Sequence, residues 1–370
     1  MRRLFQIFFA LSICFSFYVF CEEERLLPAY PHTAALAGAP GAARSESPSE
    51  PVYRFEKVAD GVYCAMGTGA VNVICNSAVI IGGNEALIVD SGASPRAARA
   101  LLSELTAVTS KPVHYLVNTH FHFDHTFGNQ AFPQDVSIIA HEYTRRKIAG
   151  DPLHERSYIS YKEGIPSQVA ALRQQAAEEK DTAKQRELLK RASVLEASLQ
   201  DFAEVVPRPP NMTVQNKLVL DLGGRQVEIL HLGRGHTGGD VVVYLPRERV
   251  VCTGDFYNGY IGNMSDAYVD EWAVSLGELA KLEFATVIPG HGAPFHDKAK
   301  IAQVQACMRD IWRQSLELRR QGVPADAAAR QIDLTSYAET FPQFRTAGLP
   351  PIATVRIYEL MDERSMGPER

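Results

Sequence analysis

The sequence is poor in cysteine. Six cysteines are spread over 370 residues, and Cys14 and Cys21 fall in an N-terminal apolar run. The four that remain are too few for a disulfide framework in a chain of this length. Cys64 and Cys75 flank a glycine-containing turn, so a bridge between them and a pair of buried thiols are both compatible with the sequence.

The sequence also lacks a strongly basic segment and an evident internal repeat. Its formal net charge is −5, which argues against nucleic acid as the main partner and leaves a small-molecule substrate as the expected one. Hydrophobic residues make up 46% and charged residues 22%, as is typical of a globular protein with a sizeable core. The pattern gives no indication of the oligomeric state.

The long apolar run of the chain lies at its N-terminus. Arg2 and Arg3 precede the run from Leu4 to Phe20, the layout of a secretory signal peptide over residues 1–21. Phe20 and Cys21 are not the small residues preferred before cleavage, so an uncleaved anchor that tethers the protein to a membrane is the alternative. Either reading predicts export, to the periplasm or out of the cell.

The remaining sequence predicts an α/β domain with two additions. Residues 22–51 are rich in Ala, Pro, Gly and Ser and predict a flexible linker. Residues 52–297 alternate strand and helix patterns, with an amphipathic helical insertion at about 160–206, and residues 298–370 predict a C-terminal helical extension. Predicted strands include residues 61–63, 71–75, 78–81, 86–89, 113–117, 136–140, 218–220, 226–230 and 241–245.

The motif that carries chemistry is H-x-H-x-D-H. His120, His122, Asp124 and His125 follow an apolar strand pattern at 113–117, and a loop suits this spacing better than a helix, which brings ligands together every three or four residues. Imidazole and carboxylate are donors that suit zinc and similar ions. Four donors so close together exceed what one tetrahedral ion needs from one loop, which suggests two ions side by side.

Three further residues lie in glycine-containing loops beside predicted strands: His236, Asp255 and His291. Each alone is compatible with an ordinary loop residue. Together they would complete the donors for two metal sites.

In these motifs the chain resembles the metallo-β-lactamase-fold hydrolases, from about Val52 to His291. The resemblance rests on residues 87–92, 120–125, 235–237, 253–255 and 289–292. It implies a four-layer αββα sandwich with the metal loops along one edge. It also implies that one metal is held by His120, His122 and His236. A second would be held by Asp124, His125 and His291, with Asp255 as a bridge between the two. Asp90 would support the metal loop without binding a metal itself.

The resemblance implies a hydrolase with two divalent ions, zinc in the first place, with iron or manganese as alternatives, and the N-terminal pattern adds the prediction of export. A hydroxide between the ions would attack an ester, thioester, lactone or amide-type carbonyl, and Asp124 would take up or relay a proton. Authentic metallo-β-lactamases typically carry cysteine or serine where this chain has Asp255. We therefore treat β-lactam hydrolysis, as a main or side activity, as an alternative to the general hydrolase. A mononuclear iron enzyme resembling persulfide dioxygenases is the other alternative.

The substrate-binding residues are the least defined part of the prediction. Tyr257 and Tyr260 follow Asp255 in a segment that would border the metals. They are the first candidates for pocket-lining residues.

Overall fold

A computed structural model describes residues 50–365. The predicted leader at 1–21 and nearly all of the predicted linker at 22–51 lie outside the described residues, so both stay predictions. Within residues 50–365, no helix combines the length and apolarity needed to cross a bilayer.

The first sheet has seven strands in sequence order, β1 to β7. The first four pair antiparallel, and β4 to β7 pair in parallel. The strands are β1 Tyr53–Ala59, β2 Val62–Gly67, β3 Ser77–Ile81, β4 Ala86–Val89, β5 Val113–Val117, β6 Ser137–His141 and β7 Met212–Val214. β3 and β4 are almost wholly buried, which explains their uninterrupted apolar sequences.

The second sheet has five strands in the order β12-β11-β10-β9-β8. Only β11 and β12 pair in parallel. The strands are β8 Lys217–Asp221, β9 Gln226–Leu230, β10 Val242–Leu245, β11 Val250–Gly254 and β12 Thr286–Pro289.

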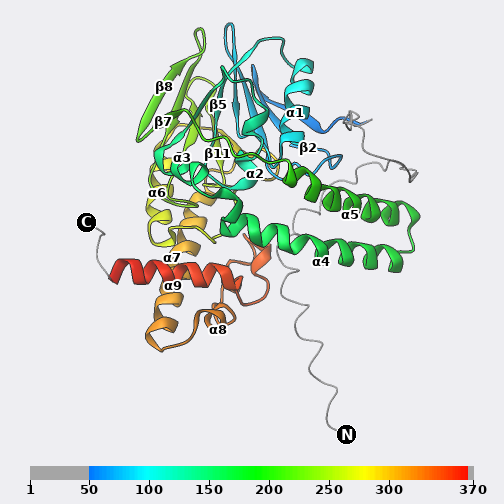
Figure 1. Cartoon of the computed structure of the whole chain (residues 1–370). Coiled ribbons are helices and arrows are strands. Elements are labelled where there is room, and N and C mark those ends of the chain that lie inside the picture. Colours follow the sequence, from blue (N-terminus) through cyan, green and yellow to red (C-terminus); the bar gives the residue numbers. More distant parts are fainter. Residues whose placement is uncertain (1–49, 366–370) are drawn as a thin grey trace.

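The two sheets pack face to face with helices on their outer faces, so the predicted αββα sandwich is confirmed (Figure 1). Apolar residues from both sheets, among them Ile80 and Val243, form the central core. Leu101 of α1 packs on the outer face of the first sheet. Leu276 of α6 packs on the second. The helices of this body are α1 Pro95–Glu104, α2 Phe123–Thr126, α3 Glu142–Ala149 and α6 Val269–Lys281.

The predicted helical insertion is an antiparallel hairpin of α4 Arg156–Glu178 and α5 Thr182–Ala203 (Figure 1). Asp181 caps α5 by accepting hydrogen bonds from the amides of Ala183 and Lys184. The base of the hairpin packs on α2, and its outer part projects from the body.

The C-terminal helices are α7 Lys300–Arg320, α8 Ala325–Ala329 and α9 Pro351–Ser365. α7 and α9 share one apolar core with α6 and the second sheet, through residues such as Ile311 and Ile357.

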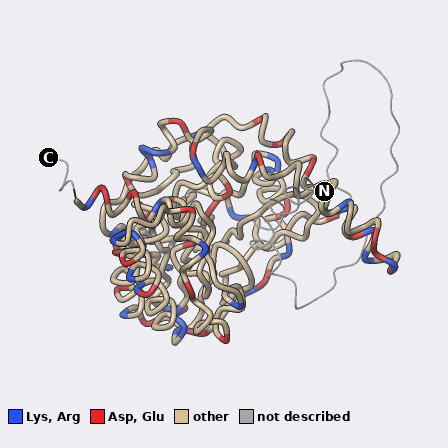
Figure 2. The backbone as a smooth tube through the Cα atoms, turned by 90° about the horizontal axis from the view of Figure 1, so that it is seen from below, with Lys and Arg blue, Asp and Glu red and all other residues tan. Residues whose placement is uncertain are grey.

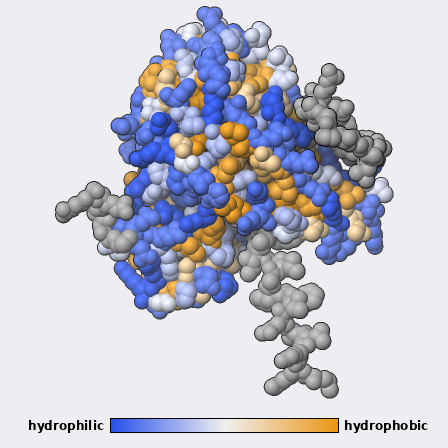
Figure 3. All heavy atoms as spheres, viewed as in Figure 1, coloured by the Kyte–Doolittle hydropathy of each residue, from blue (hydrophilic) through white to orange (hydrophobic). Residues whose placement is uncertain are grey.

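Lysine and arginine are interspersed with acidic residues along the chain (Figure 2). Apolar side chains gather near the middle of the face shown in Figure 3.

Two local predictions change in the structure, and the structure decides between the two alternatives left open for Cys64 and Cys75. Residues 71–75 form a loop, because the amides of Val73 and Cys75 bond to carbonyls two residues earlier and Ile74 has a φ of 71°. Their apolar side chains serve packing rather than strand pairing. The H-x-H-x-D-H segment is a loop only up to His122, after which α2 forms a helical turn. The four cysteines of the described residues are buried free thiols.

Candidate metal centre

The H-x-H-x-D-H segment leaves the carboxyl end of β5. Asn118 anchors the start of the segment by exchanging two side-chain hydrogen bonds with Asn129, at 2.8 and 3.0 Å. Thr126 closes the turn of α2 by donating to the carbonyl of His122 at 3.0 Å. The residues between them are buried, so the four donors have fixed positions.

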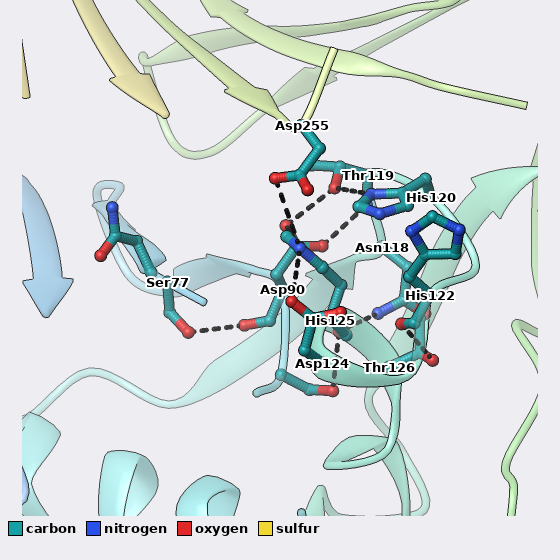
Figure 4. Close-up of polar contacts among 12 residues, drawn as sticks. Ser77, Asp90, Asn118, Thr119, His120, His122, Asp124, His125, Thr126 and Asp255 are labelled. Carbon is teal, nitrogen blue, oxygen red and sulfur yellow. Dashed lines mark hydrogen bonds and ion pairs between the residues drawn. The ribbon is translucent and has the colours of Figure 1, made fainter. Parts of the chain in front are cut away.

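The other three donors come from the second sheet. Asp255 directly follows β11 and His291 follows β12, and these strands are parallel, so both residues lie at the same sheet edge. His236 lies in the loop between β9 and β10. The structure brings all seven predicted donors together there. Figure 4 shows the four donors of the segment with Asp255 facing them from the second sheet.

Six of the seven donors form two groups, and the seventh, Asp255, lies close to His120 and His125, one from each group. The first donor group is His120, His122 and His236, and the second donor group is Asp124, His125 and His291. Within each group one ligand atom per residue lies within 4.8 Å of the others. In the first group, His122 Nδ1 and His236 Nε2 are 3.0 Å apart. In the second, Asp124 Oδ2 is 3.3 Å from the Nε2 atoms of His125 and His291.

Asp255 lies between the two groups. Its Oδ1 is 3.3 Å from His291 Nε2, and its Oδ2 is 3.5 Å from His236 Nε2. Each oxygen thus faces a different group, as a carboxylate that bridges two ions would. Asn258 fixes this orientation by donating from Nδ2 to Asp255 Oδ1 at 3.2 Å.

Asp90 determines the tautomers of two histidines. Its Oδ2 accepts a 2.8 Å hydrogen bond from the Thr119 hydroxyl and lies 2.8 Å from His125 Nδ1 (Figure 4). A hydroxyl that donates to Asp90 accepts from His120 Nδ1, 3.1 Å away. Both imidazoles therefore carry their proton on Nδ1, which leaves the lone pair of Nε2 directed into the site.

Two of the three unpartnered imidazole nitrogens of the site agree with this assignment, and the third, His236 Nδ1, lies on the side of its ring away from His122 and Asp255. Nε2 of His120 and Nε2 of His125 are buried and have no hydrogen-bond partner among the described residues. Buried polar nitrogens without partners are rare in folded proteins and call for an explanation. A bound cation supplies one, so these residues fit a metal site.

Two more imidazoles are oriented from outside. His122 Nε2 lies 3.1 Å from Asp266 Oδ2, which leaves Nδ1 for the site. His291 Nδ1 lies 3.2 Å from the carbonyl of Ile74, which leaves Nε2. Metal-binding histidines usually donate their other nitrogen in this way, and four of the five histidines here do so.

The pKa shifts of the imidazoles do not divide along the two groups: burial would lower the pKa of His122, His125 and His291, but neighbouring acidic groups raise it. Burial lowers the pKa of His120 well below its ordinary value and that of His236 to about 3, so both are neutral imidazoles. Burial would raise the pKa of Asp124 and of Asp255, but the imidazoles of His125 and His291 hold both pKa values well below the ordinary range. The carboxylates are therefore ionised and available to a cation.

Two glycines permit the close approach of these loops. A Cβ at Gly254, where φ is 50°, would lie 2.3 Å from Thr119 Oγ1. A Cβ at Gly290 would lie 2.2 Å from Asp255 Oδ1. Both distances are far below van der Waals contact, so the positions accept only glycine without a shift of the site.

The two predicted substrate-contacting tyrosines differ in position. Tyr257 is 1% exposed, donates its hydroxyl to the carbonyl of Asp297 at 2.9 Å and packs in the core of the second sheet. Its side chain is therefore directed away from the donor groups. Tyr260 is 39% exposed and lies close enough to His291 to be among the groups that raise the pKa of that imidazole, so it is near the second donor group.

Sequence reasoning missed Thr119, Asp266 and Asn258. Thr119 precedes the motif directly, and a hydroxyl in that place could have been identified as a relay. Asp266 and Asn258 lie 11 and 3 residues after Asp255 in an irregular segment, where no spacing rule identifies them. Only the folded loop brings them to the site.

Comparisons with known proteins find relatives of this chain. The family model described as the metallo-beta-lactamase superfamily matches residues 70–291. A linear primary-alkylsulfatase from a Pseudomonas strain is 26% identical over 277 residues, which are 67% of this chain and 48% of the relative. A metallo-beta-lactamase type 2 from Bacillus cereus is 34% identical over 85 residues, which are 21% of this chain and 33% of that protein.

Among solved structures, the stereoselective inverting sec-alkylsulfatase Pisa1 from Pseudomonas sp. superimposes with a TM-score of 0.58 at 16% identity. The superposition covers 86% of this chain and 52% of the sulfatase. The chain thus spans about half the length of both alkylsulfatases that it matches.

Proposed function

Because the chain belongs to the metallo-beta-lactamase superfamily, we propose that it is a metal-dependent hydrolase whose seven donors hold two divalent ions. The observation that carries the proposal is the arrangement of Asp255, with one oxygen toward each donor group. Nitrogen and carboxylate donors favour zinc, and iron and manganese are the alternatives.

The ions would supply hydroxide at neutral pH and polarise the substrate oxygen. The chain's own residues orient the ligands and handle the proton. Asp124 is ionised, and its side chain is 10% exposed beside His291, which is 24% exposed. These are among the most accessible donors, so substrate approaches the second donor group and Asp124 takes up or relays the proton released on attack.

The proposed substrates are esters, thioesters, lactones or amide-type carbonyl compounds. Sulfate esters are a second candidate, supported by the alkylsulfatase relative. That alignment covers 67% of this chain, against 21% for the Bacillus cereus β-lactamase, so it extends well beyond the segment shared with the lactamase. The larger share of the chain aligned with the alkylsulfatase favours sulfate esters over β-lactams as the next substrate class to test.

We further propose that the protein is exported, from the basic and apolar pattern of residues 1–21. N-terminal sequencing of the protein from an exported fraction tests this. A mature chain that begins soon after residue 21 agrees with a cleaved leader, and an intact N-terminus in a membrane fraction agrees with an anchor.

The deciding experiment for function combines metal analysis with a substrate panel. Protein purified without added metal should contain about two equivalents of metal, and a panel of carboxylic ester, thioester, lactone, β-lactam and alkyl sulfate substrates should reveal the hydrolysed bond. Asp124→Asn should lower kcat by about 10²–10⁴-fold. Asp60→Asn, which alters an exposed aspartate in the turn after β1, is the matched control.

One equivalent of iron, with oxygen consumption in the presence of a persulfide, would overturn the hydrolase proposal in favour of a dioxygenase. Unchanged activity of Asp124→Asn would remove Asp124 from the mechanism.

A further inference from the structure

Asp266 lies far along the chain from the motif whose histidine it contacts. Its Oδ2 is 3.1 Å from His122 Nε2, and the Ser265 hydroxyl donates to the same oxygen at 2.9 Å. Both contacts converge on one oxygen of the Asp266 side chain, and that oxygen can act as a hydrogen-bond acceptor. It can therefore accept the Nε2 proton and leave Nδ1 of His122 for the first donor group.

The segment that carries Asp266 is irregular, and side chains from two distant helices hold it. Arg156, at the start of α4, donates to the carbonyl of Ser265 at 3.3 Å. Arg356, in α9, donates from Nε to the carbonyl of Ala267 at 3.2 Å. These two carbonyls flank Asp266, so both of its neighbours are fixed.

The two arginines are themselves linked through α9. Arg156 forms two hydrogen bonds of 3.0 and 3.1 Å with the carboxylate of Glu359. Such paired contacts are strong and directional. Arg356 lies 3.6 Å from the same carboxylate, and its side chain is only 11% exposed. We define Arg156, Arg356 and Glu359 as the α9 clamp.

The loop held by the α9 clamp also reaches the loop of the third histidine. The Tyr268 amide donates to the carbonyl of Gly235, next to His236, at 2.8 Å. The guanidinium groups of Arg234 and Arg356 lie 4.3 and 5.1 Å from the centre of the Tyr268 ring. Residues 265–268 thus connect α9 with two of the three residues of the first donor group.

We propose that Asp266 is a positioning residue for His122 and that the α9 clamp sets its place, which makes the C-terminal helix part of the first metal site. The inference rests on the proposed function, because it requires that the first donor group binds metal. It assigns to α9 a role beyond covering the second sheet.

The α9 clamp holds residues 265–267 through hydrogen bonds rather than apolar contacts, and this difference affects the orientation of the backbone. An apolar contact would bury the same surface without fixing the direction of the Ser265 and Ala267 carbonyls. Hydrogen bonds from the guanidinium groups fix that direction and thereby the position of the Asp266 carboxylate between the two carbonyls. Such a position matters because mutating the outer partners of metal ligands typically changes metal affinity by about 10–100-fold.

The test is the dissociation constant of each metal site in the full chain, measured with Co²⁺ by chelator competition and by the visible spectrum. His236→Ala and His291→Ala identify which constant belongs to which group. Asp266→Asn should weaken the first donor group by about 10–100-fold and leave the second nearly unchanged. Arg356→Met should weaken metal binding by the same group by about tenfold. The variant that combines Asp266→Asn with Arg356→Met should lose less binding free energy than the sum of the two single losses.

Arg319→Met is the matched control. Arg319 lies in α7 and donates to the Tyr358 carbonyl and the Asp362 carboxylate of α9, so its loss perturbs the same helix without removing a hydrogen-bond partner of residues 265–268. It should leave both metal constants unchanged. Glu359→Gln tests the clamp a second time without removing a buried donor.

The outcomes separate the inference from the proposed function. Wild-type protein that fails to bind two equivalents of Co²⁺ refutes the dinuclear site itself. Two bound equivalents with normal affinity in Asp266→Asn overturn the role of Asp266. Weak binding in Asp266→Asn together with wild-type constants in folded Arg356→Met and Glu359→Gln overturns the clamp.

Discussion

Replacing Asp90 with asparagine should weaken both metal sites with one substitution. Asp90 has a φ of 61°, a left-handed conformation that asparagine also tolerates, so the backbone should persist. Its Oδ1 accepts a 2.8 Å hydrogen bond from the Thr119 amide, and an amide oxygen can keep that contact. The new NH₂ group then takes the place of Oδ2.

A hydrogen-bond donor at the position of Oδ2 reverses the direction of the hydrogen bonds to Nδ1 of His125 and His120. The NH₂ group opposes the Nδ1 proton of His125, and it turns the Thr119 hydroxyl so that the hydroxyl donates to His120 Nδ1. Each imidazole then carries its proton on Nε2 and loses the lone pair that faces the site. We expect each metal dissociation constant to rise about 10–100-fold. This corresponds to about 1.4–2.8 kcal/mol per site.

The assay is competition with a chromogenic chelator at fixed pH, on protein whose fold is checked by circular dichroism. Thr119→Val is the comparison variant, because it removes the relay to His120 but leaves the contact between Asp90 and His125. It should weaken the first donor group alone. Two unchanged dissociation constants in folded Asp90→Asn would refute the tautomer argument.

The remaining predictions concern packing and pH. Gly290→Ala should lower the free energy of unfolding by about 1–3 kcal/mol through overpacking against Asp255, whereas Gly277→Ala, inside α6, should be neutral or raise it by up to about 1 kcal/mol, both measured in urea. Phe202→Ala should cost about 3–5 kcal/mol because Phe202 packs with Phe123 of the metal segment. Leu189→Ala, at a position 44% exposed in the same helix, should cost far less. Burial and His231 lower the pKa of His141, the N-cap of α3, from 6.5 to about 4. Because the neutral form is favoured by folding, stability should fall as the pH drops from about 6.5 toward 4. His141→Asn should flatten that slope in thermal melts, and an unchanged slope would contradict the assignment.

Much of the fold follows from local sequence pattern. The apolar runs at 78–81 and 86–89 and the partly alternating pattern at 226–230 predict strands, and they form β3, β4 and β9 at nearly those bounds. The helical insertion also follows from its periodicity, because α5 buries Ala192 and Phe202 on one face. The loop at 71–75 misleads because its valines are apolar for packing against the first sheet.

The sequence by itself determined the seven candidate donors, because these side chains occur in recognisable loops beside strands and the folded chain brings them together. Their partition between two groups came from the resemblance to known hydrolases, and the folded chain places the atoms accordingly. Only the tertiary structure decided which nitrogen of each imidazole faces the site. That choice depends on Thr119, Asp90, Asp266 and the carbonyl of Ile74, which come from four separate segments. A hydrogen bond of about 3 Å requires a defined position in space, and no spacing along the chain encodes one between residues 144 positions apart.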